Sequence, residues 1–404
     1  MRKLNRKRIF YLAVCSIGLL FIGVMYTWSI LKAPLAEAFG FSSQQLAAAY
    51  TVLTCLYCAG SLLAGKLSET VPVKVLLVAG GLMAAAGFYI ISHAESMNMA
   101  GLCICYGALI GAGTGAAYNT LISVGNAWFT DRQGTSSGIM MMCFGVSTLL
   151  LGKLSDALFA APDFGWRRTY VALGLIILAV LVLCALLLKY PGAGEKLPSP
   201  AEKPGKSRRV EHRDYSAGEM LRRPSFWLYY VYGILSASVG SAVISFAREL
   251  STSMGATASG AVTLVGLLSV FNGLGRVLCG LSYDSLGRRV TMFISNLTTL
   301  VSPLVMIAAL LASSLPLAVV SLCLIGLSFG SNPTISSALI SEFYGRRYFS
   351  INYSISNTKL LFSSLAATAA GALLQSTGGY LAPFIMLASF AAVALGMSFL
   401  IRHP

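Results

Sequence analysis

The sequence predicts an all-α membrane protein with twelve transmembrane helices, arranged as two six-helix bundles related by a parallel repeat. Three observations lead to this fold class. Hydrophobic residues make up 56% of the 404 residues and charged residues only 11%, whereas a soluble protein carries about 25% charged residues. Twelve apolar segments are each long enough to cross a bilayer. Two sequence matches at nearly the same spacing relate the first six segments to the last six.

Each expected helix satisfies the length that a bilayer demands, which is about 20 mostly apolar residues. The first segment follows a basic N-terminus, as in a signal peptide, but no small-residue cleavage site comes after it, so we expect it to be retained. The twelve expected helices span residues 9–31, 43–66, 73–93, 100–127, 134–158, 167–189, 225–248, 259–282, 289–312, 315–340, 349–374 and 379–401.

One long polar stretch separates the sixth helix from the seventh. It is rich in Pro, Gly, Glu, Lys and Arg, so it cannot cross a bilayer and is typical of a linker. The sequence therefore predicts an N-terminal six-helix bundle at 1–190, a cytoplasmic linker at 191–224 and a C-terminal six-helix bundle at 225–404.

The two halves share sequence. Residues 128–132 (Trp-Phe-Thr-Asp-Arg) match residues 342–346 (Glu-Phe-Tyr-Gly-Arg), 214 residues later. The loop at 65–74 matches the loop at 280–289, 215 residues later. Because six is an even number of crossings, both copies enter the membrane in the same direction. This pattern is typical of a duplicated, two-bundle transporter.

The positive charge indicates orientation. The net charge is +15, and 22 of the 29 Lys and Arg residues fall in segments on the same side of the membrane as the N-terminus, against five on the opposite side. Basic residues in short loops mark the cytoplasmic face. We therefore expect a cell-membrane protein with both termini in the cytoplasm. The protein is expected to be embedded in the lipid bilayer and is not expected to bind nucleic acid.

Two cations lie deep in the predicted membrane core. Arg276 is eight residues before Asp284, roughly 12 Å from that loop, and Lys359 is about 15 Å into its helix. All 14 carboxylates fall at helix ends or in loops. Two unneutralised buried cations favour an anionic substrate such as a carboxylate. The alternatives are that Arg276 caps backbone carbonyls and that Lys359 extends toward the membrane surface.

The loop from Gly280 to Arg289 resembles the signature of the major facilitator superfamily. The resemblance implies the major facilitator fold and a gating role for Gly280, Asp284 and Arg288, with Asp284 paired to Arg288 or to a helix N-terminus. A polar turn that ends a helix is the alternative. In the first copy, the Asp, Gly and Arg of the signature are replaced by Glu69, Pro72 and Lys74.

A closer resemblance is to the oxalate/formate antiporter family, a branch near the monocarboxylate porters. It is based on residues 271–276 (Phe-Asn-Gly-Leu-Gly-Arg), on Asn352 and Tyr353 followed by Lys359, and on residues 218–227. The resemblance implies that Arg276 and Lys359 bind a carboxylate. It also implies that Tyr26 and Tyr118 line the cavity.

This sequence departs from the oxalate-transporting branch at positions that the resemblance associates with the cavity. Phe329 and Pro333 stand where that branch has two large aromatics, while Phe144 and Met25 replace a Tyr and a Gln. A larger or more apolar carboxylate than oxalate is therefore plausible. Pro333 is also expected to bend its helix, with gating as one function. Asn272 is also expected to bind substrate, with an interhelical hydrogen bond as the alternative. Packing is the alternative for Tyr26 and Tyr118.

The sequence thus predicts a secondary active transporter of small organic anions that works by alternating access, most simply an oxalate/formate-type exchanger. Monocarboxylate porters place an Asp where this chain has Asn272, which cannot carry a proton, so exchange is favoured over proton symport. A proton-coupled symporter of lactate-like or pyruvate-like anions is the alternative, and a non-transporting receptor or scaffold is a rival of another class. No enzymatic activity, cofactor or metal is expected, and a monomer suffices.

Overall fold

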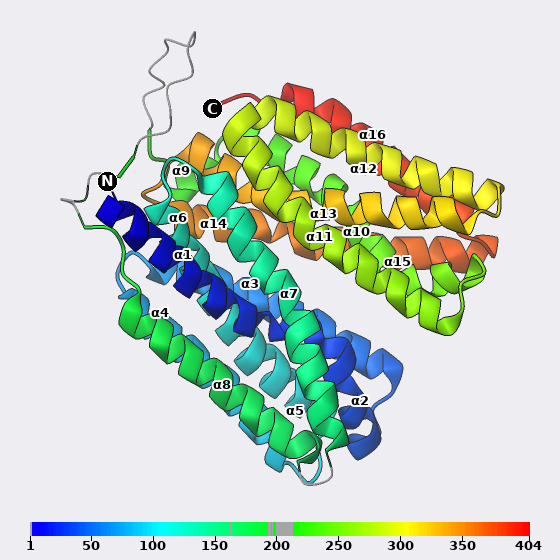
Figure 1. Cartoon of the computed structure of the whole chain (residues 1–404), viewed down its shortest axis with the longest axis horizontal. Helices are drawn as coiled ribbons and strands as arrows, with labels where there is room; N and C mark the ends of the chain where they lie inside the picture. The colour runs from blue at the N-terminus through cyan, green and yellow to red at the C-terminus, as the bar shows by residue number, and fades with distance from the viewer. Residues whose placement is uncertain (1, 162–163, 193–194, 196, 199–212) are drawn as a thin grey trace. The chain divides into compact units, whose positions relative to one another are not determined.

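The computed structural model describes residues 2–161, 164–192, 195, 197–198 and 213–404, and within them every regular element is helical. Among these described residues, twelve helical segments are long and apolar enough to cross a membrane, in the predicted order. The elements (Figure 1) are α1 Arg2–Ile22, η1 Gly23–Thr27, α2 Trp28–Phe39, α3 Ser43–Leu67, α4 Val73–His93, α5 Met99–Leu102, η2 Cys103–Gly111, α6 Ala112–Trp128, α7 Gln133–Ala160, α8 Gly165–Leu187, α9 Ala217–Leu221, α10 Pro224–Ser253, α11 Ala258–Leu286, α12 Arg288–Leu311, α13 Leu315–Tyr344, α14 Phe349–Asn357, α15 Lys359–Thr377 and α16 Leu381–Leu400. The all-α membrane fold is confirmed.

Several spans are less regular than predicted. The first combines α1, the 3-10 helix η1 and α2, and the fourth combines α5, the π-helix η2 and α6. The eleventh divides at Thr358 into α14 and α15, so that Lys359 is the first residue of α15. In contrast, α13 runs through Pro333 as one helix, and the bend expected there stays a prediction.

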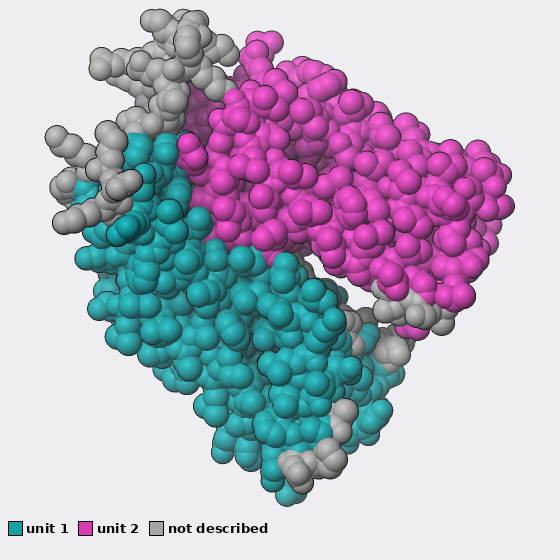
Figure 2. Space-filling view, viewed as in Figure 1, with its two compact units in different colours: residues 1–131, 143–201, 349–355 teal, residues 132–142, 202–348, 356–404 magenta. Residues whose placement is uncertain are grey.

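The chain packs as two compact units (Figure 2). Unit 1 comprises residues 1–131, 143–201 and 349–355, and unit 2 comprises residues 132–142, 202–348 and 356–404. The start of α7 therefore packs within unit 2, and most of α14 packs within unit 1. The predicted domain limits at 190 and 224 stay predictions.

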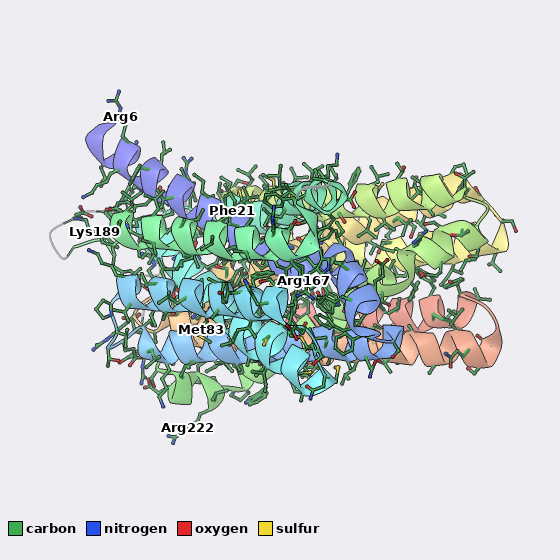
Figure 3. All side chains as sticks on the ribbon, turned by 90° about the horizontal axis from the view of Figure 1, so that it is seen from below. Arg6, Phe21, Met83, Arg167, Lys189 and Arg222 are labelled. Carbon is green, nitrogen blue, oxygen red and sulfur yellow. The ribbon has the colours of Figure 1, made fainter. Side chains whose placement is uncertain are left out.

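Labelled basic residues of unit 1 lie at both ends of its helices. Figure 3 shows Arg6 and Lys189 at the same end of its helices, whereas Arg167 lies at the opposite end of α8 and Met83 midway along α4. The apolar middle of these helices has the length that a hydrocarbon core requires.

Glycines bring α11 and α13 into backbone contact inside unit 2. A Cβ on Gly330 would overlap the carbonyl group of Asn272, and a Cβ on Gly275 would overlap that of Leu327. A Cβ on Gly326 would lie 2.5 Å from the carbonyl oxygen of Leu268. Small residues at this spacing allow two membrane helices to approach closely, because dispersion forces act only at short range.

The start of α7 contacts the other side of α11 in the same way. A Cβ on Gly280 would overlap the carbonyl of Gly134, and a Cβ on Gly138 would lie 2.5 Å from the carbonyl oxygen of Arg276. Both faces of α11 are therefore fixed by contacts that leave no room for a side chain.

We expect Gly330→Ala to destabilise the protein by about 1–3 kcal/mol, the usual cost of overpacking, because its new methyl group meets the Asn272 backbone. Gly371→Ala is the matched control, since nothing lies within 4 Å of its Cβ position in α15. Thermal unfolding of the purified proteins in detergent would measure both. Equal melting temperatures for the two variants would contradict the contact.

Candidate anion-binding site and capping loop

Lys359 is buried, with 1% of its surface exposed. Its ammonium group donates a hydrogen bond to the Tyr229 hydroxyl at 3.0 Å and another to the Ser336 hydroxyl. The ammonium nitrogen also lies 4.9 Å from the centre of the Tyr229 ring. Neutral oxygens and a π face hold the cation but do not neutralise it. The alternative in which Lys359 extends to the membrane surface is therefore wrong.

The α10 backbone makes room for this lysine. Gly233 follows Tyr229 by one helical turn, and a Cβ there would lie 2.8 Å from Lys359 Cδ and 3.1 Å from its Nζ. Next to the lysine, the Thr358 and Tyr230 hydroxyls lie 2.6 Å apart, within hydrogen-bond distance. The break in the eleventh span is thus held against α10.

Arg276, 6% exposed, projects from α11. Its Nε donates to the Asn272 side-chain oxygen at 3.3 Å, and its guanidinium donates to the Met141 carbonyl of α7. The carbonyl contact is the structural role that sequence reasoning offered as an alternative. Both hydrogen bonds go to neutral acceptors, and the guanidinium carries five N–H donors, so anion binding is compatible with them.

One turn of α13 touches both cationic residues. Thr334 donates to the Arg276 carbonyl oxygen at 3.3 Å, and Ser336, two residues later, accepts from Lys359. Pro333, which was expected to be a gating residue, precedes Thr334. Sequence reasoning missed Ser336 and Tyr229 because lone hydroxyl residues are common in membrane helices. No motif in the sequence distinguishes them from other hydroxyl residues of the spans.

Within the described part of the chain, neither cation lies within ion-pair distance of a carboxylate. The four ion pairs found there are elsewhere: Lys7–Glu195, Arg8–Asp131, Arg213–Glu219 and Arg288–Glu342. A buried charge without a counter-charge is costly, and an incoming anion lowers that cost. The electrostatics of unit 2 therefore favour an anionic ligand.

The two predicted tyrosines belong to unit 1. Tyr118 is 5% exposed, and its hydroxyl lies 3.0 Å from that of Tyr353. Its ring packs against Tyr57 and Phe144, with centroid distances of 5.7 and 4.9 Å. The side chain of Tyr26 lies outside the described residues. The structure thus brings Arg276 and Asn272 into contact, and α13 contacts both Arg276 and Lys359. It does not place the side chain of Tyr26.

Asp284 caps the start of α7. Its carboxylate accepts hydrogen bonds from the Gly134 N–H at 3.0 Å and from the Thr135 N–H and hydroxyl, each at 2.6 Å. Free N–H groups and the helix dipole both favour a negative charge there. Of the two partners expected for Asp284, the structure shows the helix N-terminus.

Arg288 contacts a different carboxylate, that of Glu342, at 3.5 Å, and lies over the Phe343 ring. Glu342 also accepts a hydrogen bond from Tyr283 at 2.5 Å. Arg288 therefore links α12 to the end of α13.

The capping loop is only half duplicated. Gly65, the counterpart of Gly280, contacts α14 in the same manner, with its Cβ position 3.0 Å from the Ser350 carbonyl oxygen. Glu69 is exposed, and no hydrogen bond or ion pair of its carboxylate occurs among the described residues. The glycine contact has thus persisted in both copies, whereas the carboxylate cap is found in one.

The chain was compared with known proteins. The Major Facilitator Superfamily model matches residues 13–358. Relatives include the uncharacterised MFS-type transporter YhjX of Escherichia coli (27% identity, covering 83% of this chain and 80% of that one) and the oxalate:formate antiporter of Oxalobacter formigenes (26%, 96% and 90%). Human monocarboxylate transporter 12 is 23% identical, with coverage of 89% and 74%. Among solved structures, the E. coli fucose:proton symporter FucP has a TM-score of 0.71 at 16% identity, covering 98% of this chain and 100% of that one. The structural likeness concerns the fold.

We expect Asp284→Ala to lower the free energy of unfolding by about 1.5–3 kcal/mol for each hydrogen bond lost to the charged group. The loss is smaller where water binds the freed N–H groups instead. Asp284→Asn keeps an acceptor oxygen and should fall between Ala and the parent. Thermal melting in detergent provides the measurement, and Glu69→Ala is the control, because that carboxylate is exposed. A melting temperature of Asp284→Ala as high as that of Glu69→Ala would refute the cap.

Proposed function

Since the chain belongs to the major facilitator superfamily, a superfamily of membrane transporters rather than enzymes, we propose that it carries small organic anions by alternating access, as an exchanger of carboxylates. One observation carries the proposal: Arg276 and Lys359 are buried cations, and among the described residues their hydrogen-bond partners are neutral groups. Arg276, Lys359 and Asn272 form the proposed binding site, and Tyr118 and Tyr26 are proposed to contribute to it.

Carboxylates fit the two cations better than other small solutes do. A guanidinium offers a planar fork for two oxygens, and an ammonium is a compact point charge. Tyr229 and Ser336 keep the ammonium solvated when no anion is bound, which reduces the cost of burying it. An arriving carboxylate adds the missing negative charge. A neutral sugar could accept hydrogen bonds from the two side chains but would leave both charges uncompensated.

The apolar surroundings favour a carboxylate with some apolar surface. A Cβ on Gly240 would overlap the ring of Phe329, so this ring is in van der Waals contact with the backbone of α10. Pro333, next to Thr334 in α13, adds no polar group. The named relatives carry oxalate and formate in one case and monocarboxylates in another. These observations support a small carboxylate more apolar than oxalate.

Exchange is proposed over proton coupling. Asn272, which accepts the Arg276 hydrogen bond, cannot titrate, and all described carboxylates lie at helix ends or in loops. The likeness to a monocarboxylate transporter keeps proton symport as the alternative. The charge bias supports cytoplasmic termini in a cell membrane, and a monomer contains both units.

We expect Arg276→Ala and Lys359→Ala each to reduce carboxylate uptake at least about 100-fold, since a buried charge contact is worth about 3 kcal/mol or more. Arg248→Ala and Lys153→Ala are matched controls, because both residues are exposed. Uptake into proteoliposomes would be measured beside size-exclusion profiles that show folded protein. Undiminished uptake by both buried-site variants would refute the site.

Counterflow in proteoliposomes tests the function itself. Vesicles are loaded with oxalate, formate, lactate or pyruvate, and uptake of each labelled anion is followed with and without a pH gradient. Exchange requires an internal carboxylate and ignores the gradient. Gradient-driven uptake into empty vesicles would establish proton symport instead, and no uptake of any of these anions would exclude the carboxylate class tested.

A further inference from the structure

The end of the predicted linker is a folded element. In residues 213–223, Ser216 and Glu219 form a capping box at the start of α9, and Arg213 pairs with Glu219 at 3.0 Å. Hydrogen bonds from the Ser216 backbone and hydroxyl, together with the one from Arg213, lower the pKa of the Glu219 carboxyl. This order requires a partner surface, because a helix of five residues is not stable by itself.

That surface is the turn between α13 and α14. The Tyr215 N–H donates to the Tyr344 carbonyl oxygen at 2.9 Å, and the two rings meet edge to face at 5.8 Å. Asp214 lies directly on the turn, where one carboxylate oxygen accepts from the Arg346 N–H at 2.8 Å and the Arg347 N–H at 3.1 Å.

Gly345 makes this contact possible. Its φ of +80° is in the left-handed region, which favours glycine. A Cβ at this position would also overlap the Asp214 carboxylate. Both its backbone conformation and its surroundings therefore exclude a side chain.

The equivalent turn of the first copy has a carboxylate of its own. Gly345 follows Asp131 by 214 residues, the offset of the repeat. In the first copy, Asp131 is part of the turn between α6 and α7 and pairs with Arg8. In the second copy, the turn has a glycine, and the carboxylate of Asp214 occupies the space where its side chain would begin.

We propose that Asp214 is a positioning residue for transport: it anchors the beginning of the eleventh span and, through α14, sets the position of Lys359. This inference rests on the proposed function of Lys359. Between this turn and Lys359 lies α14, Phe349–Asn357, about 13 Å long. Thr358, which joins α14 to α15, keeps helical backbone angles (φ −60°, ψ −17°), so a displacement of the turn is carried along the helix axis to Lys359. Such a displacement would change the contact between Thr358 and Tyr230, which lies next to Lys359.

A purely local cap is the competing explanation. It would protect the amides of Arg346 and Arg347 and contribute to stability, but it would leave the surroundings of Lys359 unchanged. The Leu361 amide, which donates to the Thr358 carbonyl oxygen at 3.0 Å, reports on those surroundings. Its exchange with solvent therefore separates positioning from local capping.

The test uses the full chain in detergent with Asp214→Ala, Asp214→Asn and the exposed-carboxylate control Glu69→Ala. Hydrogen exchange is followed in peptides containing Arg346 and Arg347 and in peptides containing Leu361. We expect Asp214→Ala to accelerate exchange at both places by about tenfold or more, since hydrogen bonds to a charged group are lost. Asp214→Asn, which retains an acceptor oxygen, should show a smaller effect, and Glu69→Ala should match the parent.

Transport kinetics provide the second measurement. With an exchanged anion identified by counterflow, Asp214→Ala should raise KM several-fold, because a displaced Lys359 ammonium binds the anion less well. Faster exchange confined to Arg346 and Arg347 would overturn the proposal, as would unchanged exchange at both places or an unchanged KM. If the parent moves no carboxylate, the proposed function fails, whereas exchange at Leu361 still decides whether Asp214 positions this helix.

Discussion

The structure of unit 2 depends on the close backbone contact that glycines allow on both faces of α11. Gly275 and Gly330 join it to α13, and Gly280 and Gly138 join it to the start of α7. Arg276 lies between these contacts, so its direction is fixed by backbone positions rather than by side-chain packing. Asp284 follows eight residues later on the same helix, about 12 Å away. One helix therefore carries both a cation of the proposed binding site and the carboxylate that caps α7.

The environment of Lys359 shows how a membrane protein can bury a cation without pairing it to a carboxylate. A carboxylate partner would stabilise the ammonium more strongly, but it would also compete with a substrate for it. Tyr229 and Ser336 offer only dipoles and a π face, which are weaker than an ion pair. This arrangement fits a ligand that supplies the negative charge itself. Neutral hydroxyl groups such as those of Tyr229 and Ser336 are sufficient for this purpose.

The sequence predicted the features that depend on composition and spacing. Twelve spans follow from the length of apolar segments, and the two embedded cations follow from the placement of charge. Details that depend on three-dimensional neighbours could not be predicted. No local signal indicated that α1 changes to a 3-10 helix at Gly23, whose Cβ would overlap the Phe144 carbonyl. The partner of Asp284 was left open between two groups, since loop sequences do not specify which helix end lies nearby. The gating roles of Gly280, Arg288 and Pro333 remain predictions.

The interruption at Thr358 has a mechanical consequence. The two copies of the repeat contain corresponding helices, and α7 runs unbroken for 28 residues, whereas its counterpart is divided into α14 and α15. Thr358 keeps helical backbone angles, but the Leu361 N–H donates to the Thr358 carbonyl oxygen three residues earlier, so the helix is tighter at this point. Irregular hydrogen bonding of this kind is where a helix bends most easily. A bend of α14 against α15 would therefore occur beside Lys359 and change the direction of its ammonium group.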